Sequence, residues 1–185
     1  MLGAKSVPCV TPEAYLAAEE QSDVRHEYVG GFVYAMAGGT QEHNTICLNL
    51  AVALRQALQG GPCRVFMADV RVQFTIRGDE YDYYPDLIVT CDKRDTQPQF
   101  VLYPSLLIEV LSPRTERVDR REKLFAYQSI ESLQEYVLVG TESKEVTLFR
   151  RANGWATERL ADADASLSLD SLQVTLPLRD IYAGV

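Results

Sequence analysis

The sequence predicts an α/β fold with a mixed central sheet flanked by helices. Two stretches, 84–89 and 107–111, are almost continuously apolar, which is typical of strands covered on both faces. A helical pattern separates the second stretch from the apolar segment Tyr136–Val139, and the order strand, helix, strand indicates a crossover between parallel strands. With 185 residues, of which 46% are hydrophobic, the chain fits a single domain, residues 1–185.

The N-terminal part predicts a short helix followed by a β-hairpin. Thr11–Glu13 has the cap, the first-turn proline and the early acid of a helix start, and this helix should end near Gln21. The segments Arg25–Val29 and Phe32–Met36 flank Gly30-Gly31, two residues that can adopt the positive φ angles of a tight turn. An N-terminal helix and hairpin are therefore expected beside the central sheet.

A longer helix is the next predicted element. Thr40 can cap its start and Gly60-Gly61 can end it. Its apolar residues recur at every fourth position: Ile46, Leu50, Leu54 and Leu58. His43 lies on the same stripe, one turn from the positively polarised N-terminus, so its side chain is expected to face the interior.

Alternating apolar and polar residues then predict a half-buried strand over Val70–Ile76, with a turn at 77–79. A helix is expected over Asp119–Ile130, after Ser112-Pro113 ends the strand before it. The C-terminal region is interpreted as a β appendage of apolar segments separated by polar turns: Val146–Phe149, Trp155–Leu160 and Leu172–Leu176.

The charge balance limits the partners of the chain. A formal net charge of −8 argues against the broad basic surface that gives non-specific affinity for nucleic acids. A nuclease is disfavoured but not excluded, because a metal-binding enzyme needs clustered acids and phosphate contacts can come from a local patch.

The cysteines Cys9, Cys47, Cys63 and Cys91 are far apart in the sequence, with no CxxC pair and no neighbouring histidine at zinc spacing. We expect reduced core thiols rather than a zinc site or a disulfide framework. No stretch reaches the apolar length of a membrane span, and residues 1–10 lack the apolar region of a signal peptide, so the cytoplasm is the expected compartment.

Asp86 and Glu109 are single carboxylates within apolar strand patterns. Burying an ionised carboxylate costs several kcal/mol unless a partner or a metal compensates, so two such acids indicate a shared cation. If the two strands pair, the carboxylates can meet, and Glu109 shares its face with Leu107 and Leu111. Oxygen ligands of this kind suit Mg²⁺ or Mn²⁺, with the backbone carbonyl of Val110 as a further ligand.

A lysine follows these acids on the predicted helix. Asp119, Lys123 and Tyr127 are spaced by four residues, so they form one stripe that can project toward the end of the Glu109 strand. An ammonium group there can orient an attacking water or stabilise the charge of a phosphoryl-transfer transition state, which favours phosphodiester hydrolysis. The alternative is an ion pair between Lys123 and Asp119 on a solvated helix face.

The order helix, three strands, helix, strand, with Pro85-Asp86 and then Glu109–Leu111, resembles the PD-(D/E)XK nuclease superfamily. Residues spread over almost the whole chain are similar to the bacterial family of putative restriction endonucleases: Arg25-His26-Glu27, Gly31, Met36, His43, Tyr84-Pro85-Asp86, Glu109-Val110-Leu111-Ser112-Pro113, Asp119, Lys123, Tyr127 and Glu135-Tyr136. The resemblance implies a restriction endonuclease-like core and an endonuclease that hydrolyses DNA with Mg²⁺ or Mn²⁺. By analogy with enzymes that cut both strands, it also implies a homodimer.

The resemblance also implies roles for individual residues. Asp86 and Glu109 would be metal ligands, and Lys123 the catalytic cation. The supporting residues would be Glu27, His43 and Tyr127. One departure concerns the lysine, which in the superfamily usually lies two residues after the glutamate, where this chain has Leu111, so Lys123 has to act from the helix.

Each of these assignments has a simpler alternative. Asp86 can merely begin a strand, Glu27 can pair with Arg25 on the hairpin, and His43 can be a hydrogen-bonded core residue. The segment 114–123 offers four candidates for phosphate contacts: Arg114, Arg117, Arg120 and Arg121. Its mixed charge is also typical of a solubilising surface.

Two other functions stay open from the sequence. The first is a catalytically inactive module with the same fold that binds nucleic acid or self-associates, which the acidic net charge and Leu111 favour. The second is metal-assisted hydrolysis of a small phosphate ester, in which case DNA would neither bind nor compete.

Overall fold

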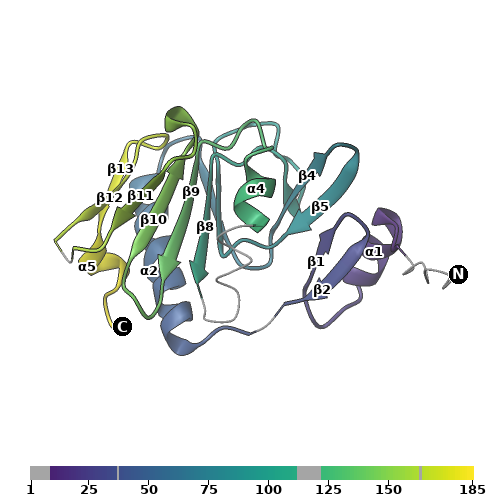
Figure 1. Ribbon diagram of the computed structural model, residues 1–185, viewed down its shortest axis with the longest axis horizontal. Coiled ribbons are helices and arrows are strands. Elements are labelled where there is room, and N and C mark those ends of the chain that lie inside the picture. The colour runs from purple at the N-terminus through teal and green to yellow at the C-terminus, as the bar shows by residue number, and fades with distance from the viewer. Residues whose placement is uncertain (1–8, 37, 112–121, 163) are drawn as a thin grey trace, which may run out of the picture.

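A six-stranded central sheet organises the structure, a computed structural model that describes residues 9–36, 38–111, 122–162 and 164–185 (Figure 1). Its strand order is β11-β10-β9-β8-β6-β3. The strands are β3 (Arg64–Met67), β6 (Leu87–Thr90), β8 (Leu106–Leu111), β9 (Glu135–Gly140), β10 (Val146–Arg150) and β11 (Thr157–Leu160). Strands β8 and β9 run parallel and the other neighbouring pairs run antiparallel, so the expected mixed sheet is confirmed.

A second sheet has the order β2-β1-β5-β4-β7. Its strands are β1 (His26–Val29), β2 (Phe32–Ala35), β4 (Arg71–Ile76), β5 (Asp79–Tyr83) and β7 (Phe100–Val101). The predicted hairpin of β1 and β2 is present, and Gly30 and Gly31 have φ angles of 52° and 96° in its turn. A side chain is rarely tolerated in this left-handed region, which is why glycine occupies both positions.

The described helices are α1 (Pro12–Glu19), α2 (Gln41–Ala57), α4 (Leu124–Tyr127) and α5 (Leu178–Ile181), with a 3₁₀ turn, η2, at Arg151–Asn153. Both predicted caps are present, because the hydroxyls of Thr11 and Thr40 each accept an N–H bond at 3.2 Å. Of the helix predicted over 119–130, the structure describes the part from residue 122 onward. No helix in the described ranges is long and apolar enough to cross a membrane.

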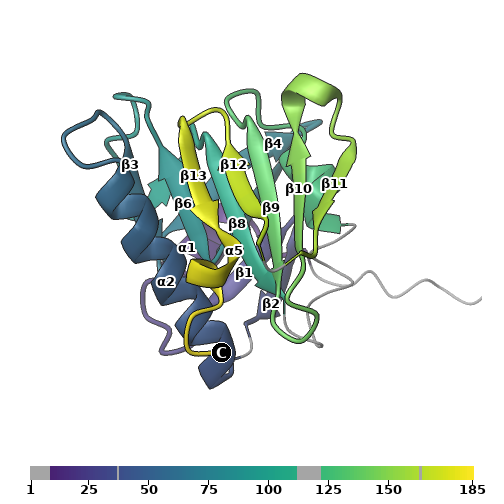
Figure 2. The same cartoon turned by 90° about the vertical axis from the view of Figure 1, so that its left-hand side faces the viewer.

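The central sheet has a separate hydrophobic core on each face. Helices α2 and α5 and the hairpin of β12 (Ser166–Leu169) and β13 (Val174–Pro177) cover one face (Figure 2), and α4 and the second sheet cover the other. Side chains of β8 alternate between them, so Ile108 packs toward α2 while Leu107 and Leu111 pack toward α4. The predicted C-terminal β appendage is only partly separate from the central sheet. Strands β10 and β11 belong to that sheet, whereas β12 and β13 form a two-stranded sheet of their own.

Strand β5 is an element that the sequence pattern did not predict. Its sequence, Asp79–Tyr83, is rich in acids, which are uncommon in strands. The strand forms because it pairs with β1 on one side and β4 on the other, and its buried Asp82 lies 3.7 Å from the guanidinium of Arg71. Tertiary pairing therefore overrides the local preference here.

The expectation of four reduced thiols is wrong for one pair. Cys63 and Cys91 form a disulfide, whereas Cys9 is an exposed thiol and Cys47 a buried one. The antiparallel register of β3 and β6 pairs Arg64 with Thr90, which places the two cysteines opposite each other. The spacing of 28 residues hid this pairing, because it arises only when the strands meet.

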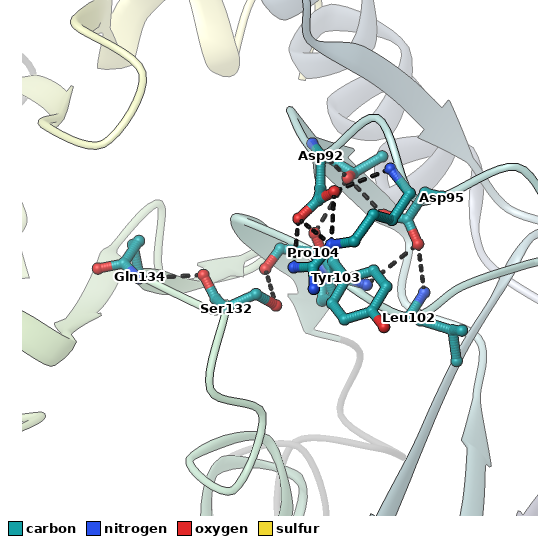
Figure 3. Close-up of polar contacts among 9 residues, drawn as sticks. Asp92, Asp95, Leu102, Tyr103, Pro104, Ser132 and Gln134 are labelled. Carbon is teal, nitrogen blue, oxygen red and sulfur yellow. Dashed lines mark hydrogen bonds and ion pairs between the residues drawn. The ribbon is translucent and has the colours of Figure 1, made fainter.

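A polar network holds the segment between β6 and β8, the two strands nearest the predicted acids (Figure 3). Buried Asp95 accepts N–H bonds from Leu102 at 2.7 Å and Tyr103 at 3.1 Å, and a hydroxyl bond from Thr90 at 2.5 Å. The Ser132 hydroxyl donates to the carbonyl of Pro104 at 2.9 Å. The chain therefore enters β8 from a fixed position.

We predict that Asp95→Ala lowers the free energy of unfolding by about 3 kcal/mol, because it removes three charge-assisted hydrogen bonds from a buried site. Asp180→Ala is the matched control, since this carboxylate is 63% exposed and pairs with Arg179 at the surface, and it should cause a much smaller loss. Urea unfolding measures both. Equal losses for the two variants would contradict the role given to Asp95.

Candidate functional site

The register of β6 and β8 brings the two predicted acids to neighbouring positions. Leu87 pairs with Ile108, so the next pair in this register is Asp86 with Glu109. Asp86 Oδ2 accepts the N–H of Val110 at 2.7 Å. The expectation that both acids lie in buried strands is wrong for Asp86, which precedes β6 and is 21% exposed, whereas the Glu109 side chain is 5% exposed.

Lys123 lies in the interior and contacts two carboxylates from different sheets. Its Nζ is 2.8 Å from Oε1 of Glu27 on β1 and 2.9 Å from Oε1 of Glu109 on β8. The Lys123 side chain is only 7% exposed, so the alternative of a solvated helix face does not hold. The ammonium also lies 5.5 Å from the centre of the Tyr83 ring, a favourable cation–π contact.

Tyr127 joins this group from α4. Its hydroxyl donates to Glu109 Oε1 at 3.1 Å, the same oxygen that faces Lys123. Burial raises the pKa of Tyr127 well above its usual value, and the nearby Glu109 carboxylate raises it further. The neighbouring Tyr83 also has a raised pKa, again mainly because of burial. Both hydroxyls therefore stay protonated at neutral pH and can act only as neutral groups.

His43 connects α2 to Asp86, as its place on the buried stripe suggested. Its Nε2 lies 3.3 Å from Asp86 Oδ1, and its Nδ1 lies 3.6 Å from Cys47 Sγ. Burial raises the pKa of the Cys47 thiol, and the Asp86 and Glu109 carboxylates add to the effect. The expectation that no cysteine has a neighbouring histidine at zinc spacing is wrong, because His43 and Cys47 lie four residues apart on α2 and share a face.

The carboxylates of Asp86 and Glu109 are suitable ligands for a hard divalent cation. Asp86, just before β6, and Glu109, on the adjacent strand β8, supply carboxylate oxygens, which Mg²⁺ and Mn²⁺ bind. For Val110 the structure shows a contact of its N–H with Asp86. The role of its carbonyl as a metal ligand stays a prediction. The four arginines proposed as phosphate contacts, at positions 114, 117, 120 and 121, lie outside the described residues.

Sequence reasoning missed two features of this site. Cys47 was expected only as a reduced core thiol, and its contact with His43 was not predicted, although the spacing of four residues was a usable signal. The ion pair of Lys123 with Glu27 was also missed, because it joins residues 96 positions apart that meet only when the second sheet packs on the central one. The hairpin that carries Glu27 gave no sign of this contact.

Comparisons with known proteins agree with this architecture. A model of the family Uma2, described as "Putative restriction endonuclease", matches residues 12–179. Two uncharacterized Synechocystis proteins are similar: slr1290 is 36% identical over 96% of this chain and 94% of its own, and sll1609 is 26% identical over 94% and 100%. A crystal structure titled a putative nuclease belonging to DUF820, from Anabaena variabilis, has the same fold, with a TM-score of 0.79, 20% identity, and coverage of 94% and 98%.

We predict that stability falls as the pH rises above about 10, the ordinary pKa of tyrosine in an unfolded chain. Tyr127 and Tyr83 keep their protons to higher pH when folded. Their contribution is therefore complete below about pH 10 and is lost as the pH rises further, because only the unfolded chain releases these protons.

Urea unfolding at a series of alkaline pH values measures this loss, and tyrosinate absorbance reports ionisation. Tyr127→Phe should make the fall less steep, whereas Tyr34→Phe, at an exposed position on β2, should not change it. Ionisation of every tyrosine near pH 10 in a still-folded protein would contradict the prediction.

Proposed function

Because the chain belongs to the Uma2 family, we propose that it is a metal-dependent endonuclease that hydrolyses phosphodiester bonds in DNA. The fold shared with a structure titled a putative nuclease supports a nuclease-like role. The observation that carries the proposal is the buried Lys123 ammonium, held at 2.8 Å from Glu27 and at 2.9 Å from Glu109, which lies opposite Asp86 in the strand register. A buried ion pair is a poor way to gain stability alone, so a chemical use is the better explanation.

In this proposal Asp86 and Glu109 hold Mg²⁺ or Mn²⁺, with the Val110 carbonyl as a further ligand. The bound ion supplies Lewis acidity and lowers the pKa of water. Lys123 donates a hydrogen bond to the attacking water or to the phosphoryl oxygens as negative charge develops on them. It reaches this position from the start of α4, although Leu111 occupies the strand position that the superfamily usually gives to the lysine.

The remaining polar residues position these groups. Glu27 fixes the Lys123 ammonium from β1, and Tyr127 fixes the Glu109 carboxylate by its hydrogen bond. His43 holds Asp86 from α2. In this proposal β1, α2 and α4 hold the reacting groups in position before any substrate arrives, which is the condition for electrostatic catalysis.

DNA is the proposed substrate, and a homodimer acting on both strands in the cytoplasm is part of the proposal. The net charge of −8 means that phosphate contacts have to come from a local patch. The arginines at 114, 117, 120 and 121 are the proposed source, since they follow β8 directly.

We predict cleavage of plasmid or oligonucleotide DNA with Mg²⁺ or Mn²⁺ and none with a chelator. Asp86→Ala and Glu109→Ala should each lower the rate by about a thousandfold, because a metal ligand is lost. Asp180→Ala, which removes an exposed carboxylate, is the control and should retain the rate. Undiminished cleavage by the double variant, or no cleavage of any DNA form with either metal, would refute the proposal. The second result would favour an inactive binding module.

We predict that Lys123→Met lowers the rate by about a hundredfold or more, because a preorganised donor to the transition state is lost. Adding Leu111→Lys should restore part of the activity, since residue 111 shares the face of Glu109. Circular dichroism must show that both variants fold, because Lys123→Met leaves two carboxylates facing each other. If the folded Lys123→Met variant cleaved at the normal rate, Lys123 would have no catalytic role.

A further inference from the structure

A second set of ligand atoms adjoins the proposed magnesium site. His43 and Cys47 on α2 and Asp86 before β6 each offer one ligand atom, and these atoms all lie within 4.8 Å of one another. The donors are an imidazole nitrogen, a thiol sulfur and a carboxylate oxygen. Mg²⁺ does not select such a set, whereas Zn²⁺, Co²⁺ and similar ions bind all three donor types.

The spacing of these atoms is close to what such an ion needs. Bond lengths of about 2.0–2.3 Å place the ligand atoms of a tetrahedral site about 3.3–3.8 Å apart. The His43 Nε2 to Asp86 Oδ1 distance is 3.3 Å and the His43 Nδ1 to Cys47 Sγ distance is 3.6 Å. The imidazole bridges its two neighbours through different nitrogens, so a bound ion would take one nitrogen and a small ring shift would complete the set.

The surroundings of the three residues support a built site. The helix places His43 and Cys47 on the same face, and a Cβ atom at position 39 would lie 2.8 Å from His43 Nδ1, so Gly39 leaves room for the ring. Cys47 is buried, while His43 and Asp86 are partly exposed. One side of the set is therefore open to an entering ion and to a fourth ligand.

We propose that His43, Cys47 and Asp86 bind a thiophilic divalent transition-metal ion of the Zn²⁺ type, with water as the fourth ligand. When the ion binds, a metal–sulfur bond forms, the thiol proton passes to solvent, and no atom changes oxidation state. Because Asp86 belongs to both sets, this ion and Mg²⁺ exclude each other. That second statement rests on the proposed function, whereas the three-residue site does not.

Titration with Co²⁺ tests the site, because a cobalt–thiolate bond gives a charge-transfer absorption that oxygen and nitrogen ligands do not produce. The band should appear in the wild-type protein with its disulfide intact and disappear in Cys47→Ser. Cys9→Ser removes the other free thiol and should keep the band. Glu109→Gln should also keep it. Zn²⁺ affinity, by calorimetry, should fall at least about tenfold in Cys47→Ser.

Absence of the band in the wild-type protein, or its persistence in Cys47→Ser, would overturn the proposal. The shared use of Asp86 is tested separately. Excess Mg²⁺ should weaken the cobalt band. Zn²⁺ should slow Mg²⁺-dependent cleavage less in Cys47→Ser than in the wild type, when each protein is compared with its own rate without Zn²⁺. No effect of either ion would show that the two sites are independent. If the protein cleaves no DNA, the cobalt band still decides the three-residue site.

Discussion

The ion pairs of Lys123 are the interaction on which the arrangement of the molecule depends. The ammonium joins Glu27 of the second sheet to Glu109 of the central sheet, at the start of the helix that packs between them. Burying these charges is costly, and removing any one of them leaves another without compensation in a medium of low dielectric constant. The same three side chains, Glu27, Glu109 and Lys123, therefore determine both how the two sheets pack and how the charges of the candidate site are arranged.

In the proposed mechanism, this arrangement lets Lys123 take the role of a strand lysine at position 111, where this chain has leucine. Leu111 packs into the hydrophobic core beside α4, and the ammonium enters the same region from the helix instead. A lysine on β8 would share the rigid frame of Glu109, whereas Lys123 depends on the placement of α4. The site thus gains its cation from an element whose position is set by aromatic packing, including the Tyr83–Tyr127 and Tyr127–Tyr136 ring contacts.

Much of this could be predicted from local patterns. The apolar run of β8 indicated a buried strand, and its period of two placed Glu109 on the face of Leu107 and Leu111, as the structure has it. What local patterns could not give depends on register and on contacts between sheets. The acidic sequence of β5 resembles a loop until β1 and β4 flank it, and Cys63 meets Cys91 only through the pairing of β3 with β6. The ion pair with Glu27 has the same origin.

The alternation of β8 between two cores also restricts how this chain can vary in length. The segment between β6 and β8 is tied down by Asp95, so an added or deleted residue there would be passed on to β8. An insertion of one residue would turn Glu109 toward α2 and place Ile108 beside Lys123. A shift by two would keep the face but put Leu107 or Leu111 beside Lys123, so the carboxylate would again be lost from the ion pair. Relatives that differ in the length of this loop should therefore absorb the change at its exposed tip.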